Sequence, residues 1–206
     1  MDKNRKRMET MHRMRAKGLE LFYQKGYHAT SIDDILKELS LSKGAFYHHF
    51  KSKEDFFISI TQNIIMQKVY ALLVEPLAQD KSPIPVIIDT LNNALETAEH
   101  NSMDCGFMLG NFLTEFNRGE NEVLQYLKDI LKVWEINLIS ALKNGKSDGH
   151  IARHVNCEEV ATYIISSYMG IRTMMASGNA KMLKYQYIQQ LKAYMYTLEQ
   201  EKETIY

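Results

Sequence analysis

A short stretch of this 206-residue chain gathers side chains that could bind phosphate groups. Gly44 and Ala45 are small, so the backbone there can approach a groove floor without obstruction. Hydroxyl, ammonium and imidazole groups, which donate hydrogen bonds to phosphate oxygens, surround this pair: Ser42, Lys43, Tyr47, His48, His49 and Lys53. The stretch therefore indicates a nucleic-acid contact rather than a reaction centre.

Two short helices with a turn between them are expected to position these side chains. The first begins at a Thr30-Ser31 start signal and runs to about Leu39, with Ser31 as its cap and two aspartates in its first turn. Residues 40–42 form the turn, and the second helix runs from Lys43 to about residue 49. This arrangement is a helix-turn-helix. Helices that begin near Ser31, Ser42 and Ser52 also offer backbone N–H groups to phosphates.

The charge of the chain is divided unevenly, although its formal net charge is zero. Up to Lys53 there are twelve Lys and Arg against six Asp and Glu, whereas the remainder has thirteen against nineteen. Such an asymmetry suggests an N-terminal module that faces nucleic acid or a membrane. A solvated basic face is the alternative explanation.

Nearly every other segment carries the 3.6-residue period of an amphipathic helix, so we predict an all-α fold of about nine helices. A helix that starts after Ser52 should continue to about Val74 and stop at Pro76. One later helix is expected to begin near Pro83, and three further helices are expected to end near Gly119, Gly145 and Ser177. The last helix should carry an apolar stripe from Tyr187 to Leu198. Asn156, with Glu159 three residues on, resembles a capping box.

The residues from 26 to 57, GYHATSIDDILKELSLSKGAFYHHFKSKEDFF, and the leading helix from Leu19 resemble the N-terminal domain of tetracycline-repressor-type (TetR/AcrR) transcriptional regulators. The segment CGFMLGNFLTEF from Cys105 resembles one found in a subset of these regulators. The resemblance implies a helix-turn-helix DNA-binding domain over 1–52 and a ligand-binding and dimerisation domain over 53–206. It further implies a homodimer whose recognition helices enter successive major grooves of a palindromic double-stranded operator.

Individual roles follow from the resemblance. Thr30 and Ser31 would bind phosphate, and Lys43, Gly44 and Ala45 would lie at base edges. Tyr47, His49 and Lys53 would bind the DNA backbone. His48 would lie either there or at a base. Two positions depart from the family. Ser40 replaces a common Gly in the turn, at a cost of about 1 kcal/mol if the backbone is left-handed, and Gly18 replaces a common Ala, which we expect to cost only helix propensity.

The part of the chain after residue 52 holds eight of the twelve Met and nine of the twelve Tyr. Both residue types suit a pocket for a moderately large, partly apolar ligand. The candidate ligand-binding residues are Met66, Met103, Met108, Asn111, Glu115, Trp134, Tyr168 and Met174. Asn111 and Glu115 share a helix face, where buried polar groups would need a partner. The alternative is that these residues form plain core and dimer interface, and the last two helices are expected to pair with their two-fold mates.

Other functions find weaker support. His100 with Cys105 is the one pair suggestive of a nucleophile, and no HExxH, Walker A or GxGxxG motif is present, so no enzyme, cofactor or metal is expected. His48 and His49 point about 100° apart, which does not suit a shared metal. Two cysteines and the lack of an apolar run of ~18 residues favour a cytoplasmic protein outside membranes. The sequence thus predicts a ligand-responsive transcriptional regulator and favours a repressor over an activator. The alternative is a DNA-binding protein of this fold without an inducer.

Overall fold

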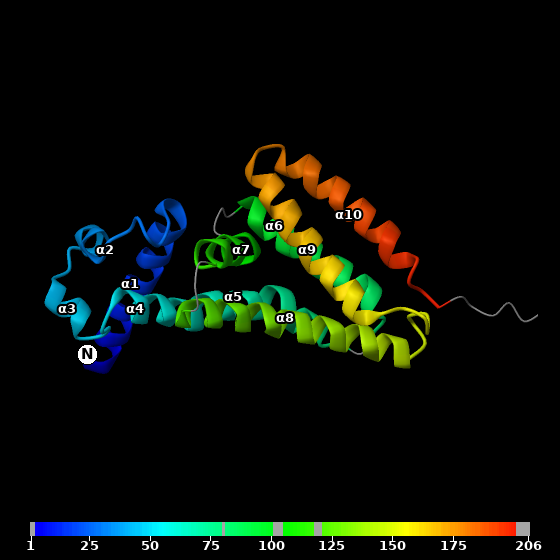
Figure 1. The fold of residues 1–206 in the computed structure, drawn as a ribbon, viewed down its shortest axis with the longest axis horizontal. Coiled ribbons are helices and arrows are strands. Elements are labelled where there is room, and N and C mark those ends of the chain that lie inside the picture. The colour runs from blue at the N-terminus through cyan, green and yellow to red at the C-terminus, as the bar shows by residue number, and fades with distance from the viewer. Residues whose placement is uncertain (1–2, 80, 101–104, 118–120, 201–206) are drawn as a thin grey trace, which may run out of the picture. The chain divides into compact units, whose positions relative to one another are not determined.

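The computed structural model describes residues 3–79, 81–100, 105–117 and 121–200 of the chain. Over this part the chain is helical, apart from an isolated β-bridge between Ile151 and Glu199. The helices (Figure 1) are α1 (Lys3–Lys25), α2 (Ile32–Leu39), α3 (Lys43–Tyr47), α4 (Lys53–Ile60), α5 (Met66–Val69), α6 (Pro83–His100), α7 (Cys105–Glu115), α8 (Glu122–Ser147), α9 (Cys157–Ala176) and α10 (Ala180–Tyr196). With Lys53–Leu77 counted as one helix, the described residues form nine, and the predicted all-α class is confirmed.

The stretch Lys53–Leu77 is continuous but irregular. Two π-helical turns, η1 (Thr61–Ile65) and η2 (Tyr70–Val74), flank α5, and a 3-10 turn, η3 (Glu75–Leu77), ends the stretch as the proline signal predicts. By length and composition alone this stretch could cross a membrane, with a mean hydropathy of 1.3. The core helix of a water-soluble protein passes the same test, so this is weak evidence for a span.

The chain forms two compact units. The first comprises residues up to 68 together with 108–130, and the second comprises 69–107 together with 131–206. The first unit therefore contains the helix-turn-helix, the start of the long helical stretch and most of α7. The predicted functional division into 1–52 and 53–206 concerns binding roles and stays a prediction.

The core of the first unit is rich in aromatic rings. Phe56 and Phe57 are fully buried, and the Phe57 ring lies 4.9 Å from that of Phe112 on α7 in an edge-on arrangement. Gly18 makes this packing possible, because a Cβ atom there would lie 2.5 Å from Cε1 of Phe56. Besides the expected small loss in helix propensity, Gly18 therefore has a packing role that was not predicted, since the missing side chain makes room for a ring.

In the second unit, α10 packs on both α6 and α9. Trp134 of α8 and Tyr168 of α9 are buried with their rings edge-on at 5.5 Å. α8 continues to Ser147, so the expected end at Gly145 is wrong. A Cβ atom at Gly145 would lie 2.3 Å from Cγ of Pro83, which explains the glycine by close packing rather than by helix termination.

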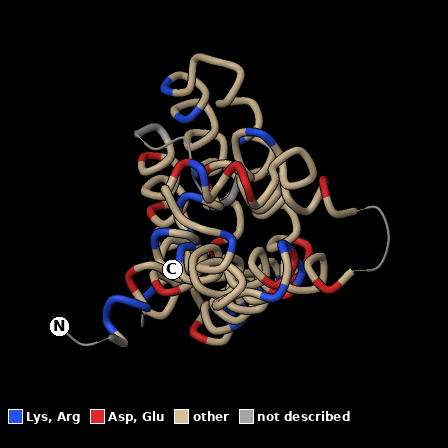
Figure 2. Tube along the Cα trace, turned by 90° about the vertical axis from the view of Figure 1, so that its left-hand side faces the viewer, with Lys and Arg blue, Asp and Glu red and all other residues tan. Residues whose placement is uncertain are grey.

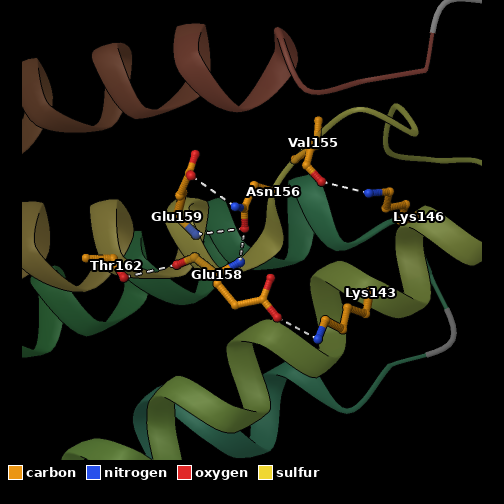
Figure 3. A network of polar contacts seen from close by, with 7 residues as sticks. All are labelled: Lys143, Lys146, Val155, Asn156, Glu158, Glu159 and Thr162. Carbon is orange, nitrogen blue, oxygen red and sulfur yellow. Dashed lines mark hydrogen bonds and ion pairs between the residues drawn. The ribbon is translucent and has the colours of Figure 1, made fainter.

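The start of α9 is held by a polar network (Figure 3). Asn156 is its N-cap, and its Oδ1 accepts hydrogen bonds from the backbone N–H groups of Glu158 and Glu159. The Glu159 carboxylate accepts from the Asn156 side chain at 2.9 Å instead of from the cap backbone. The predicted cap is thus confirmed, while the second bond of the box differs. Lys143 of α8 forms an ion pair of 2.6 Å with Glu158.

Candidate nucleic-acid interface

The turn between α2 and α3 has the geometry that a helix-turn-helix needs. Ser40 is left-handed, with φ 53° and ψ 43°, and its N–H and that of Leu41 donate to carbonyls of the last turn of α2. The predicted strain at Ser40 is therefore present in the backbone. Ser42 caps α3 by accepting a hydrogen bond from the Ala45 N–H at 3.2 Å. α3 ends at Tyr47, two residues earlier than predicted.

One face of α3 is polar and open to solvent while the other holds it to the domain. Phe46 is fully buried, and its ring packs against Phe56 with centroids 5.3 Å apart. The exposed residues of this segment are Ser42, Lys43, Gly44, Tyr47 and His48, with Ala45 half-buried beside them. The structure thus brings together, on one short helix and its ends, six of the ten residues predicted to bind DNA.

Lys43 forms an exposed ion pair of 2.9 Å with Asp33 of α2. The hydrogen bond to Asp33 and the charge of its carboxylate raise the pKa of Lys43. Exposed pairs of this kind contribute little to stability. The ammonium can therefore exchange its carboxylate partner for a phosphate or a base edge at low cost.

Two residues predicted to bind phosphate, Ser31 and Thr30, differ in their exposure to solvent. Ser31 is exposed and forms a capping box with Asp34, whose carboxylate accepts from the Ser31 hydroxyl at 2.6 Å. These hydrogen bonds from Ser31 lower the pKa of Asp34. Thr30, in contrast, is 1% exposed, and its hydroxyl donates to the Gly26 carbonyl at 2.8 Å. The Thr30 side chain thus holds the loop before α2, and phosphate binding at Thr30 stays a prediction.

Lys53 also has a structural role that the sequence did not predict. Its ammonium donates to the carbonyls of Tyr27 and Thr30 at 2.8 and 3.0 Å and lies 4.2 Å from the centre of the Tyr27 ring. Burial lowers the pKa of Lys53, opposed by the nearby Glu115 carboxylate. In this conformation Lys53 holds the loop, and its contact with the DNA backbone stays a prediction.

His49 lies in a cluster of positive groups drawn from two helices. Burial lowers the pKa of His49, and His48, Arg7 and Arg15 lower it further through their charges. Within the described residues, the buried Nδ1 atom of His49 has no hydrogen-bond partner. Arg15 is anchored by a 2.7 Å hydrogen bond to the Ser59 hydroxyl. A negatively charged group near His49 would favour its protonated form and raise this pKa again.

Glu115 contacts the same loop from α7. Its Oε1 accepts a hydrogen bond from the His28 N–H at 3.0 Å. Phe116 follows and packs on the Tyr27 ring with centroids 4.7 Å apart. The loop before α2 is thus fixed by α7 as well as by α4.

An open cleft of about 710 Å³ lies in the first unit beside this loop, with Tyr27, His28, Glu54, Glu115 and Asn121 among its lining residues. A second cavity, of about 170 Å³, lies in the second unit near the start of α6 and the end of α8. Of the eight predicted ligand-binding residues, Glu115 alone lines either of these two cavities.

The predicted ligand-binding residues do not share one environment. Met108, Trp134 and Tyr168 are buried, and Met66 is half-buried. Asn111 and Met174 are exposed, so the expectation of a buried polar pair at Asn111 and Glu115 is wrong. Met103 lies outside the described residues, as do the side chains of His100 and Cys105. Ligand binding by these residues stays a prediction.

Arg7 and Arg15 were not predicted to lie near His49. A signal was available, because Arg7 lies eight residues before Arg15 and both fall in the basic run at the start of the chain. The role of Glu115 could not be read in this way, since His28 lies 87 residues away along the chain.

The geometry defines a helix-turn-helix protein, and comparison with known proteins identifies the family. Residues 15–60 match the profile of bacterial regulatory proteins, tetR family, and residues 83–185 match the tetracyclin repressor-like C-terminal domain. The chain therefore belongs to the tetR family and is a transcriptional regulator with a DNA-binding helix-turn-helix. Members of this family are not enzymes.

Individual relatives agree with this assignment. The HTH-type transcriptional repressor DhaR of Mycobacterium sp. (strain GP1) is 27% identical over 161 residues, 75% of this chain and 76% of the relative. The fold resembles a TetR transcriptional regulator from Chloroflexus aurantiacus J-10-FL, with a TM-score of 0.86, 24% identity, and 96% and 100% of the two chains covered. It also resembles FadR of Bacillus subtilis in complex with stearoyl-CoA, with a TM-score of 0.71, 18% identity, and 88% and 97% covered.

Proposed function

We propose that this regulator is a repressor that binds a palindromic operator as a homodimer and is released by a small, partly apolar ligand. The observation that carries the DNA half is the solvent-exposed polar face of α3, held from behind by the buried Phe46. Lys43, Gly44 and Ala45 reach base edges, while Ser31, Ser42, Tyr47, His48 and His49 contact the backbone. A relative named as a repressor supports the direction of control.

The dimer is supported by exposed apolar side chains on the last two helices. On α9, Tyr163 and Met174 are 44% and 53% exposed and lie eleven residues apart, on one face. On α10, Met182, Tyr185 and Tyr196 are exposed by half or more and also share a face. Burial of these faces against their two-fold mates would give the symmetry that a palindromic operator requires.

Release by a ligand would be a shift of population between two dimer states. One state spaces the recognition helices to fit the operator, and the ligand binds the other state more tightly. The continuous stretch from Lys53 to Val74 acts as the lever, because it carries the chain from the DNA-binding helices to the body. FadR, solved with stearoyl-CoA, supports a ligand with an apolar part. A coupling of ~1–3 kcal/mol suffices for partial release. The site of action is the cytoplasm.

Binding of the purified chain to the DNA upstream of its own gene, against scrambled DNA over a series of salt concentrations, tests the proposal. We expect the logarithm of the affinity to fall with that of salt at a slope of about −0.9 per phosphate contact. Lys43→Ala should weaken operator binding and leave the unfolding transition unchanged, while Lys128→Ala, at an exposed lysine of α8, is the matched control. Equal affinity for both duplexes would contradict the proposal.

The ligand half needs a separate readout. Native mass spectrometry of the dimer would detect a co-purified ligand, and acyl thioesters would be the first compounds added to the DNA complex. Release of DNA supports the repressor with an inducer. Tight operator binding that no compound relieves would favour the alternative, a DNA-binding protein of the same fold without an inducer.

A further inference from the structure

The first three turns of α1 are a cationic extension that precedes the family match. The match begins at residue 15, whereas α1 begins at Lys3. Arg5, Lys6 and Arg7 are exposed, and Glu9 is the one acidic residue between positions 3 and 15. Figure 2 shows Lys and Arg positions close to the N-terminal end of the chain. In the part of the chain that the structure describes, no carboxylate lies within ion-pair distance of these three side chains.

Helical spacing shows where Arg7 points. Residues 7, 11, 14 and 18 share one face of α1. Met14 and Gly18 on this face are buried in the core and Met11 is half-buried, but Arg7 is exposed. The face that packs inward therefore passes beyond the core at Arg7, where it is open to solvent.

Contact with the DNA-facing surface is supported by His49. Arg15, about two turns beyond Arg7 on α1, lies over the ring of Phe50, the residue after His49, at 5.9 Å from its centre, and the charge of Arg7 also acts on His49. Figure 1 shows the N-terminal end of α1 next to α3. From Arg5 to Met14 the helix rises about 14 Å, which equals about four base-pair steps of a duplex. The extension is thus long enough to follow the DNA backbone beside the recognition helix.

We infer that the start of α1, through Arg7 with Arg5 and Lys6, is a second DNA contact that binds backbone phosphates next to those held by His49. This inference rests on the proposed function and extends its interface beyond the helix-turn-helix. Because phosphates carry no sequence information, the contact adds affinity for every duplex and no preference among them. A phosphate at this place would also favour the protonated form of His49, whose pKa is lowered by burial and by the nearby positive charges.

Three variants test the inference: Arg7→Ala, Arg7→Lys, and the triple variant Arg5→Ala, Lys6→Ala, Arg7→Ala. Each phosphate contact contributes about 0.9 to the salt slope, so Arg7→Ala should reduce it by about 1.8 per dimer and the triple variant by more. The loss should be equal for operator and scrambled DNA. Arg7→Lys should retain most of the slope. Lys128→Ala, which also removes one exposed cation, is the control.

The outcomes separate the two proposals. If the wild type prefers the operator and Lys43→Ala weakens binding, but Arg7→Ala and the triple variant keep the wild-type slope, the inference is overturned and the proposed function stands. If the wild type shows no preference for any duplex, the proposed function fails. Loss of binding to anionic lipid vesicles by the triple variant, with an unchanged DNA slope, would overturn the inference in favour of a membrane contact. Circular dichroism and sedimentation confirm that each variant is folded and keeps its oligomeric state.

Discussion

Two loops of the molecule are built from similar parts. The first loop, residues 26–31, leads into α2, and the second loop, residues 148–156, leads into α9. Each contains a glycine with positive φ, Gly26 at 88° and Gly149 at 77°. Each ends at a residue that caps the following helix, and each of those helices has two acidic residues in its first turn.

Each loop is fixed by its own lysine, which donates hydrogen bonds to backbone carbonyls. Lys53 donates to Tyr27 and Thr30 in the first loop, and Lys146 donates to Val155 in the second at 2.7 Å. Lys53 is the first residue of α4, where the helix dipole disfavours a cation, whereas Lys146 lies in the last turn of α8, where the dipole favours it. The contacts of Lys53 must therefore overcome a cost that Lys146 does not meet.

Each loop is also tied to a segment distant in sequence. Glu115 of α7 accepts a hydrogen bond from the His28 N–H, and in the second loop the Ala152 N–H donates to the Leu198 carbonyl at 2.9 Å, beside the bridge between Ile151 and Glu199. The loops differ in the group that makes this tie, which is a side-chain carboxylate in the first loop and the backbone in the second. Since α2 carries the turn and α3 with it, the first loop orients the DNA-facing helices.

Removal of the two lysines should give the largest contrast. Lys53→Met leaves the carbonyls of two buried residues, Tyr27 and Thr30, without their charged donor, and we expect a loss of about 3 kcal/mol in the free energy of unfolding. Lys146→Met removes one such bond and should cost about 1 kcal/mol. Urea denaturation of both variants measures the difference. Equal losses would show that the two loops are held alike.

The stability losses of alanine variants at the two glycines should differ by less than those of the two lysine variants. A Cβ atom at Gly26 would lie 3.2 Å from Oε1 of Glu115, while one at Gly149 meets nothing within 4 Å. Both alanine variants suffer the left-handed strain of ~1 kcal/mol or more, and Gly26→Ala should lose about 1 kcal/mol beyond that by displacing the Glu115 carboxylate. Thermal unfolding of the pair checks this order. A larger loss at Gly149 would contradict it.

The tie from α7 should contribute less to stability than Lys53 or Gly26. Glu115→Ala removes the acceptor of the His28 N–H, and we expect a loss of about 1 kcal/mol, whereas Glu115→Gln keeps an acceptor oxygen and should lose about half as much or less. Native-state hydrogen exchange at His28 reports the bond directly. Unchanged protection of that amide in Glu115→Ala would show that the bond does not hold the loop. Glu122→Ala, at an exposed position of α8, serves as control.

The same contrast explains which features the sequence could reveal. Ser31, Ser40 and Asn156 act on residues within five positions of themselves, and their caps and turn follow from residue type. Gly18 and Glu115 act on partners 38 and 87 residues away, Phe56 and His28, so their roles depend on packing that no local pattern contains.

The residues of the candidate site also divide into those whose role is set by nearby residues and those whose role depends on distant packing. The exposed residues of α3 could be predicted, because the motif is local and its buried side is a single phenylalanine. Thr30 and Lys53 carry groups suited to phosphate, yet the fold turns both inward to hold the loop. Residue type alone cannot distinguish a hydroxyl or ammonium that faces DNA from one that faces a carbonyl. The predicted ligand pocket depends on long-range packing throughout and is scattered for that reason.

The finest contrast between the loops lies in the acidic residues that follow them. Hydrogen bonds from Ser31 lower the pKa of Asp34, whereas the hydrogen bond and charge of Lys143 lower that of Glu158. Each depressed pKa gives stability that is complete above the ordinary value, 3.8 for Asp34 and 4.5 for Glu158, and is lost as the pH falls through the folded value. The two causes differ in their response to salt, because an exposed ion pair is screened and a short hydrogen bond to a hydroxyl is not.

Carboxyl titration by NMR at low salt and at about 1 M salt, where the screening length is about 3 Å, measures this difference. The pKa of Glu158 should return toward 4.5, while that of Asp34 should stay depressed. Lys143→Met and Ser31→Ala should each reduce one shift and spare the other, and the backbone N–H bonds to the two carboxylates account for what remains. If salt moved both carboxyls equally, the loop before α2 would owe its cap to the surrounding charges rather than to Ser31, and its attachment would rest on Lys53 and Glu115 alone.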